Sequence, residues 1–169
     1  MLLCIVLLMA SSSAWGRAAA CDGINHVRLY MHETVGGPNS TVFATVMPLF
    51  GANTTFGMVG LLDDELRDGK DPSKSLLLGR FQGMVAYSGR VNPPGMQSVI
   101  SFIFTAGKYN GSTLAMVGTV VSFQGEFERA IVGGTGAFRF ARGYCGVKAV
   151  STPTPVLTVY EVNLFVKMD

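Results

Sequence analysis

The stretch LLLGRFQGMVAYSGRVNPPGMQSVISFIFTAGKYNGSTLAMVGTVV, residues 76–121, decides the fold class. Three runs in it, 76–87, 97–105 and 112–121, have β-type composition, and the segments NPPG and KYNGS separate them. Proline, glycine and asparagine suit tight turns because they favour the backbone angles that turns require. The stretch has no sustained 3.6-residue periodicity of the kind that indicates a long amphipathic helix. It predicts consecutive antiparallel strands.

The same pattern continues on both sides of this stretch. Further runs with β-type composition, bounded by Gly, Pro or Asn, cover residues 27–34, 41–47, 55–62, 128–132, 138–147 and 157–168. The chain is therefore predicted to be all-β, with eight or nine antiparallel strands. Such a set forms a sandwich or a closed barrel, and closure leaves no unpaired strand edges. An eight-stranded barrel has room for one small ligand.

Length and composition indicate one exported domain. The chain has 169 residues, 49% of them hydrophobic, which is enough for a sizeable core. Its formal net charge of +2 gives no indication of nucleic acid or an anionic membrane as a partner. Residues 1–20 combine a short apolar run with small residues and predict a secretory signal peptide. Later apolar runs are shorter than the roughly 20 residues of a membrane helix, so residues 21–169 are expected to form a soluble barrel domain.

Two further features agree with export. Glycosylation sequons begin at Asn39, Asn53 and Asn110, each among turn-forming residues, and we expect at least one to carry a glycan. Cys21 and Cys145 remain after the signal is removed. In an oxidising compartment they could form a disulfide, and the sequence leaves open whether they pair or stay free.

Strand alternation predicts two charged residues inside the barrel. In VRLYMHET, residues 27–34, Glu33 shares a face with apolar side chains. In FRFARGY, one face consists of Phe138, Phe140, Arg142 and Tyr144. Because a buried charge is costly unless it is paired, Glu33 and Arg142 either pair with each other or line a polar cavity. The alternative is that both lie exposed at the ends of their strands.

Other motifs support no further chemistry. The run VGGTG, residues 132–136, lacks the lysine of a phosphate-binding loop and is expected to be a turn that leads into a strand. His32 is expected on the outer wall, and neither the histidines nor the cysteines have the spacing of a zinc site, so no metal is expected. The acidic stretch 61–73 is expected to be a solvated connection. No G-x-S-x-G nucleophile motif is present.

The chain resembles the plant dirigent proteins. The segments LYMHETVGGPN, FGMVGLLDDELRDG, LLGRFQGMVAYS, FIFTAGKYNGSTLAMVG and IVGGTGAFRFARGY are similar to successive signature blocks of that family, in the family's order. The resemblance implies a calycin-like, eight-stranded antiparallel β-barrel that is secreted to the apoplast, often glycosylated and assembled as a homotrimer, or alternatively a homodimer. It implies no cofactor.

The resemblance also implies a function. Family members impart stereoselectivity on the coupling of phenoxy radicals from monolignols such as coniferyl alcohol, giving optically active lignans. A separate laccase or peroxidase makes the radicals, so no intrinsic oxidase activity is expected. Some relatives act instead as lyases or cyclases through a quinone methide. A third possibility is a defence-related wall protein that binds phenolics without turnover.

The family's functional positions transfer in part. The first family acid falls on Glu33 and the family arginine on Arg142, and these are the predicted catalytic residues. The second family acid falls on Ala137 and is missing, and of two family tyrosines only Tyr87 is present, with Val85 at the other position. The predicted substrate-binding residues are Tyr87, Phe102, Phe104, Phe138, Phe140 and Tyr144.

Overall fold

The computed structural model describes residues 23–48, 54–91 and 95–168. In these ranges the chain forms nine strands and two short 3-10 turns. The strands are β1 (Ile24–Thr34), β2 (Val42–Val46), β3 (Val59–Arg67), β4 (Leu77–Tyr87), β5 (Met96–Phe104), β6 (Thr113–Val120), β7 (Glu126–Thr135), β8 (Arg142–Thr154) and β9 (Leu157–Lys167). The turns are η1 (Gly107–Tyr109) and η2 (Gly136–Phe138). In the described part of the chain, no helix is long and apolar enough to cross a membrane.

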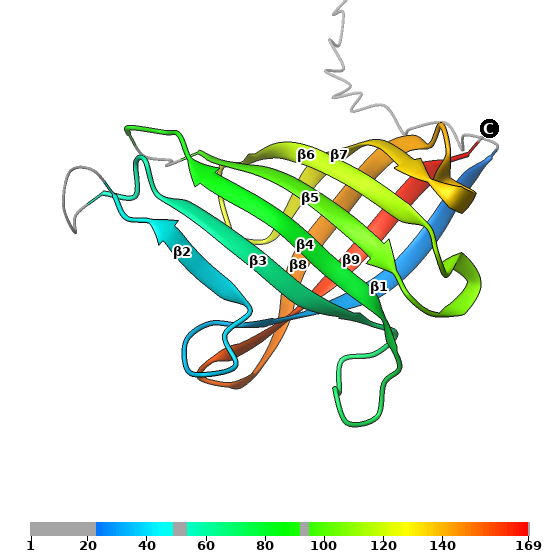
Figure 1. Cartoon of the computed structure of the whole chain (residues 1–169), viewed down its shortest axis with the longest axis horizontal. Helices are drawn as coiled ribbons and strands as arrows, with labels where there is room; N and C mark the ends of the chain where they lie inside the picture. Colours follow the sequence, from blue (N-terminus) through cyan, green and yellow to red (C-terminus); the bar gives the residue numbers. More distant parts are fainter. Residues whose placement is uncertain (1–22, 49–53, 92–94, 169) are drawn as a thin grey trace, which may run out of the picture.

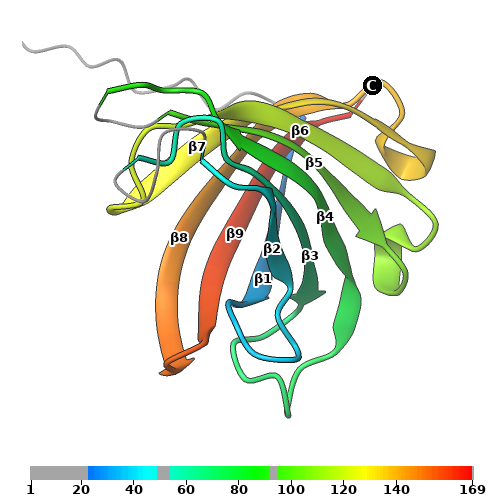
Figure 2. The ribbon, with the colours of Figure 1, turned by 60° about the vertical axis from the view of Figure 1, so that its left-hand side comes forward.

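Eight of the strands close into an antiparallel barrel. The sheet order is β1-β9-β8-β7-β6-β5-β4-β3-β2, and an additional β1–β3 pairing closes the ring. Strand β3 pairs with β4 along one edge and with two strands along the other, where Glu65–Arg67 pair with β1 and Val59–Leu62 pair with β2. Figures 1 and 2 show β2 lying beside β3. The prediction of an all-β, eight-stranded antiparallel barrel is confirmed.

Alternation along the strands fills the barrel. In β5 every second side chain from Met96 to Phe104 is buried, and the residues between them are exposed or half-buried. The central core contains large side chains from facing strands, including Phe81, Ile100, Phe102 and Leu114. Burying such side chains stabilises the fold by about 1.5–3 kcal/mol each.

The two ends of the barrel interior differ. At the end where η1 and η2 lie, the rings of Phe104, Tyr109 and Phe138 pack together, with centroids 4.6–5.6 Å apart. We call this the packed end. At the other end lie the β4–β5 and β6–β7 loops, and we call it the mouth.

The VGGTG run and the segment after it depart from the prediction. Residues 132–135 are the last residues of β7 and do not form the expected turn, which begins only at Gly136. Residues 136–138 form η2, and β8 begins only at Arg142, so there is no continuous strand from residue 138. Gly136 has a φ of +62°, and a side chain there would meet Ser112, which accounts for a glycine in this turn. The 3-10 turn breaks the period-two count, so Cys145 and Val147 point inside.

The expectations for the acidic stretch 61–73 and for His32 are each met only in part. Residues 61–67 belong to β3, so the expectation of a solvated connection is wrong for this half of the stretch. His32 lies on the outer face as predicted, but it is buried, and its Nε2 is 3.0 Å from the carbonyl oxygen of Gly69 in the β3–β4 loop.

Candidate functional site

A small cavity opens inside the mouth of the barrel. Its volume is about 50 Å³, which is enough for a water molecule or a carboxyl group but less than a whole phenylpropanoid occupies. Charged, aromatic and apolar side chains from several strands surround it. They are Met31, Glu33, Leu62, Phe81, Val85, Met96, Phe123, Phe127, Arg129 and Tyr160.

Glu33 and Tyr160 form one polar wall of this cavity. They lie on the neighbouring strands β1 and β9, and the Tyr160 hydroxyl donates a hydrogen bond of 3.2 Å to Glu33 Oε1. Burial raises the pKa of the Glu33 carboxyl, and the Tyr160 hydrogen bond opposes that shift. Burial and the neighbouring Glu33 also raise the pKa of Tyr160. The wall therefore presents a carboxyl group that is protonated more readily than one in water.

Asp64 adds a second acid on the inner face of β3. It is 0% exposed, it accepts a 2.5 Å hydrogen bond from the Thr41 hydroxyl, and its Oδ2 has no partner. Burial raises its pKa to about 8, and the charge of Glu33 acts in the same direction. The raised pKa favours the neutral form of Asp64, and its Oδ2 has no partner in the described part of the chain. Sequence reasoning missed it, although the alternation Leu62, Asp64, Leu66 carries the signal.

Arg129 on β7 is the cation of this site. It is 6% exposed, and its Nη1 donates a 3.1 Å hydrogen bond to Ser98 Oγ. Its guanidinium carbon lies 5.8 Å from the ring centroid of Phe81 and 5.4 Å from that of Phe127. Burial lowers the pKa of Arg129. Sequence reasoning missed this residue too, although Phe127, Arg129 and Ile131 alternate in phase along the strand.

Arg142, the arginine predicted for this role, lies elsewhere. It is exposed on the outer wall, and its Nη1 donates a 2.9 Å hydrogen bond to the carbonyl oxygen of Ala141. The prediction that it faces the interior is wrong because η2 shifts the alternation of β8 by one residue. Tyr144 shares this outer face and stacks on Phe165 at 4.7 Å. Phe140 is 71% exposed, so neither aromatic residue lines the cavity.

The other predicted contact residues are divided between the two ends. Tyr87 is half-buried on β4 near the mouth, where burial and the charge of Glu33 raise its pKa. Phe102 is fully buried and meets Phe81 edge-on at 5.0 Å, directly below the cavity wall. Phe104 and Phe138 belong to the packed end, where they fill the interior.

The structure also locates most of the predicted cysteine and glycosylation positions and the position of the missing family acid. Cys145 is a free, fully buried thiol on the inner wall, so of the two possibilities left open for it the structure has the unpaired one, and Cys21 lies outside the described residues. Asn39 and Asn110 are exposed, whereas Asn53 lies outside the described residues. Ala137, the position of the missing family acid, is exposed in η2.

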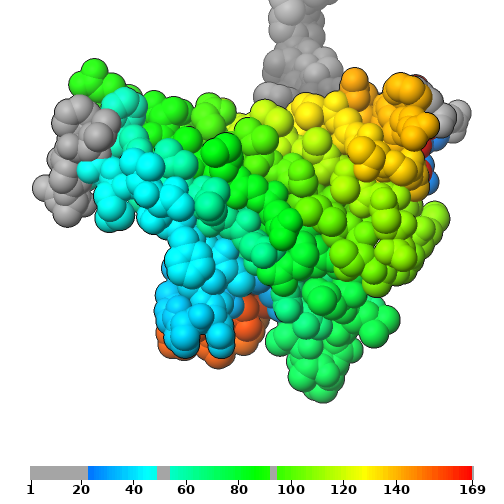
Figure 3. All heavy atoms as spheres, in the orientation of Figure 1, coloured from blue at the N-terminus to red at the C-terminus, as the bar shows by residue number. Residues whose placement is uncertain are grey.

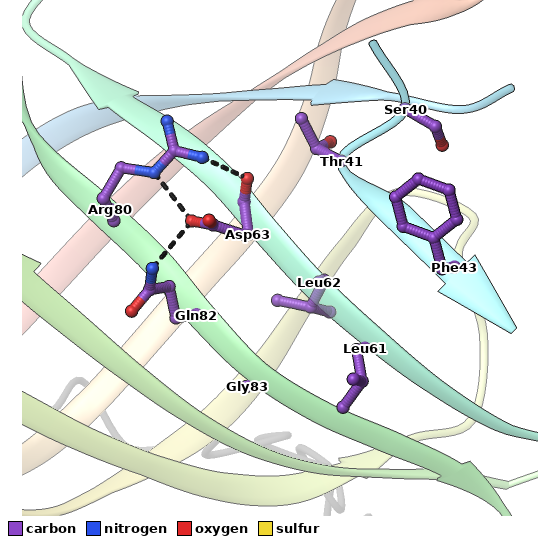
Figure 4. A pocket seen from close by; sticks show the side chains of 9 residues that line it. All are labelled: Ser40, Thr41, Phe43, Leu61, Leu62, Asp63, Arg80, Gln82 and Gly83. Carbon is purple, nitrogen blue, oxygen red and sulfur yellow. Dashed lines mark hydrogen bonds and ion pairs between the residues drawn. The ribbon is translucent and has the colours of Figure 1, made fainter. Parts of the chain in front are cut away.

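A larger hollow lies on the outer wall between β2, β3 and β4. Its volume is about 410 Å³, and Figure 4 shows the side chains that line it. Here Arg80 Nε and Gln82 Nε2 donate hydrogen bonds of 2.7 and 2.9 Å to Asp63 Oδ1. Because these polar groups pair with one another, the outer hollow offers little unmet hydrogen bonding. The mouth cavity is lined by Arg129, whose Nε has no partner among the described residues, and it is the better candidate site despite its smaller volume.

Comparisons with known proteins agree with this architecture. The family model described as "Dirigent-like protein" matches residues 24–167. The chain is 37% identical over 169 residues to dirigent protein 1 of Arabidopsis thaliana, an alignment that covers 96% of this chain and 91% of that relative. It is 36% identical over 150 residues to pterocarpan synthase 1 of Glycyrrhiza echinata, which covers 85% and 79% of the two chains.

Solved structures give the same result. The pterocarpan synthase dirigent protein GePTS1 superposes with a TM-score of 0.74 at 36% identity, over 85% of this chain and 83% of that one. The pterocarpan synthase dirigent protein PsPTS1 superposes with a TM-score of 0.75 at 34% identity, over 87% and 96%. The family model and these relatives cover most of the described barrel, and this chain belongs to the dirigent family.

Proposed function

We propose that this protein imparts stereoselectivity on the coupling of phenoxy radicals from monolignols, giving optically active lignans. The observation that carries the proposal is the pair of walls at the mouth: Glu33 and Tyr160 on one side, and Arg129 between two phenyl rings on the other. Aromatic surfaces accept a phenolic ring, and the polar groups fix its oxygen atoms.

The protein supplies orientation to this reaction. A separate laccase or peroxidase removes one electron from each phenol, which also loses its proton. Two radicals then combine to form one carbon–carbon bond, with no electron exchanged with the barrel. Radicals that combine unaided need a fixed relative geometry far more than a lower barrier. A protonated Glu33 on the cavity wall can donate a hydrogen bond to a phenoxyl oxygen and hold it in place.

The cavity is too small for a monolignol, so a side chain that lines it must move for the ligand to bind. A space of about 50 Å³ does not hold a monolignol in the present arrangement of side chains. Phe123 lies in the β6–β7 loop, lines the cavity, is 52% exposed, and meets Phe127 edge-on at 5.7 Å. Displacement of this exposed side chain enlarges the cavity at a small loss of packing.

A second candidate function is acid-assisted ring closure through a quinone methide. Two buried acids with raised pKa values favour it, as does the likeness to proteins named pterocarpan synthase. In this reaction a carboxyl group donates its proton to a leaving hydroxyl, which departs as water, while the phenol conjugated with that carbon releases its proton to solvent and becomes the quinone methide. A second phenol oxygen of the same molecule then bonds to the quinone methide carbon and its proton returns to the carboxylate, while the quinone oxygen takes up a proton from solvent and becomes a phenol again.

Product chirality tests both functions. Coniferyl alcohol is coupled by laccase with and without the protein, and the enantiomers are separated by chiral chromatography. We expect an excess of one enantiomer with the wild type and a racemate with Glu33→Gln. The matched control is Glu161→Gln, which changes a glutamate on the same wall at the outer face of β9.

A racemate with the wild type contradicts the coupling proposal, and product from a closed-shell substrate without oxidant favours ring closure instead. Phenolic binding without a change in either product would favour a carrier role.

The proposal also covers the oligomeric assembly of the protein and its cellular location. The outer faces of β3 to β6 carry Leu61, Met84, Val99 and Val117, which are exposed and directly opposite one another in successive strand pairs. Figure 3 shows the face of the molecule on which β3, β4 and β5 lie. This apolar row supports a homotrimer, or a homodimer, in which a second copy covers it. Secretion to the apoplast and glycosylation at the exposed Asn39 or Asn110 belong to the same proposal. Light scattering of the wild type and of Val99→Glu tests the assembly, with a lower mass expected for the variant.

A further inference from the structure

Arg129 is a buried cation without a counterion. Among the described residues it forms no ion pair, its hydrogen-bond partner is the neutral Ser98, and its Nε has no partner. Ser98 is already satisfied as a donor, because its hydroxyl donates a 3.0 Å hydrogen bond to the carbonyl oxygen of Gly118. An isolated charge in an apolar interior is costly, and paired charges are the rule in such places.

The neighbouring acids do not supply the missing charge. Burial raises the pKa of Asp64 to about 8 and also raises that of Glu33. Neither carboxyl lies within ion-pair distance of Arg129 in the described part of the chain. The Arg129 guanidinium therefore has no paired anion among the described residues at the mouth.

The free edge of the Arg129 guanidinium favours a planar anion with two oxygens. Nη1 is engaged with Ser98, while Nε–H and the adjacent Nη2 form the edge that binds the two oxygens of a carboxylate. The space of about 50 Å³ beside it fits a carboxylate group. The rings of Phe81 and Phe127 flank the guanidinium and favour an aromatic body next to that carboxylate.

We propose that the mouth cavity binds an aromatic carboxylate of the hydroxycinnamate class, with its carboxylate on Arg129 and its ring between Phe81, Phe127 and a displaced Phe123. The assignment of a phenolic ring rests on the proposed function, whereas the carboxylate is assigned from Arg129 alone. At the opposite wall, Glu33 and Tyr160 face the phenolic end of such a ligand. The protein then distinguishes a phenylpropanoid acid from the corresponding alcohol.

The test compares two ligands that differ at one end. Binding of 4-hydroxycinnamate and 4-hydroxycinnamyl alcohol is measured by titration calorimetry at pH 7, with the wild type, Arg129→Met and Arg142→Met. We expect the acid to bind the wild type at least about tenfold more tightly than the alcohol, as charge-assisted hydrogen bonds imply. Arg129→Met is expected to abolish this preference, and Arg142→Met, which removes the exposed arginine, is expected to retain it.

A third ligand makes the test independent of the variant's folding. The methyl ester of 4-hydroxycinnamate keeps the ring and removes the negative charge, so the wild type is expected to bind it as weakly as the alcohol. Equal affinities for acid, ester and alcohol would overturn the inference and leave the coupling proposal intact. An unchanged preference in a folded Arg129→Met would overturn it as well. Failure of all three ligands to bind would contradict the proposed phenolic site itself.

Discussion

The two ends of the barrel interior are built from the same strands but differ in chemistry. At the packed end, alternation brings only apolar and aromatic side chains together, and Phe104, Tyr109 and Phe138 close the space. At the mouth, the same alternation places Glu33, Asp64 and Arg129 inside, and some of their polar atoms have no partner. The comparison separates stability from function: one end fills its volume, and the other keeps buried polar atoms that have no partner among the described residues and that water or a ligand can satisfy.

The largest expected effect is a loss of stability caused by a substitution at the packed end. Phe138→Ala removes a ring that is 0% exposed and in contact with Phe104 and Tyr109. We expect the free energy of unfolding to fall by about 3–5 kcal/mol, because a cavity replaces the ring. Urea denaturation measures it, with Phe123→Ala at the mouth as the matched control, for which a loss below about 1 kcal/mol is expected. Equal losses at the two positions would remove the distinction between the ends.

The second effect is a pH dependence that originates at the mouth. The pKa of Asp64 rises from 3.8 to about 8 on folding, so the folded protein holds a proton that the unfolded chain releases. The free energy of unfolding is therefore expected to fall as the pH rises through this window, by up to about 1.4 kcal/mol per pH unit. Glu33 contributes with the same sign.

Asp64→Asn isolates this contribution. The amide oxygen still accepts the Thr41 hydrogen bond, but the side chain no longer titrates. Denaturation between pH 5 and pH 8 is expected to give a flatter profile for the variant than for the wild type. Parallel profiles would mean that the Asp64 carboxyl is not protonated in the folded barrel.

The smallest expected effect is a gain in stability at the mouth, opposite in sign to the loss expected at the packed end. Arg129→Met replaces an unpaired buried cation with an apolar side chain of similar length, so we expect the free energy of unfolding to rise by about 1–2 kcal/mol. Differential scanning calorimetry without ligand measures the change, and Arg142→Met on the outer wall is expected to stay within about 0.5 kcal/mol. A destabilised Arg129→Met would indicate that the guanidinium holds the mouth together.

The antiparallel strands followed from local signals, and the choice of an eight-stranded barrel over a sandwich followed from the family resemblance. Turn residues between β-type runs predicted the antiparallel strands because turn chemistry and side-chain alternation act over a few residues. The same local counting placed Glu33 correctly on the inner face of β1. It failed for Arg142, since η2 inserts residues that do not follow the period of two, and Phe140 there has a φ of +64° that alternation does not foresee.

The site was predicted only in part for a different reason. Asp64 and Arg129 are in phase with buried neighbours on their own strands, but charged residues within polar segments such as LLDDELRDG are usually solvated. Which charged residues are enclosed depends on how the sheet closes and on which loops cover its ends. Strand pairing between β1 and β3, far apart in the sequence, brings the two acids to one wall.

The sequence by itself determined an all-β barrel, its approximate strands and its family, since these depend on short-range patterns and recurring segments. Only the tertiary structure decided that Arg129 rather than Arg142 faces the interior, that Asp64 is buried, and that Cys145 is a free thiol. The physical reason is that burial of a charge is a property of the closed sheet. A strand in isolation has two faces, and closure of the barrel makes one of them the inside.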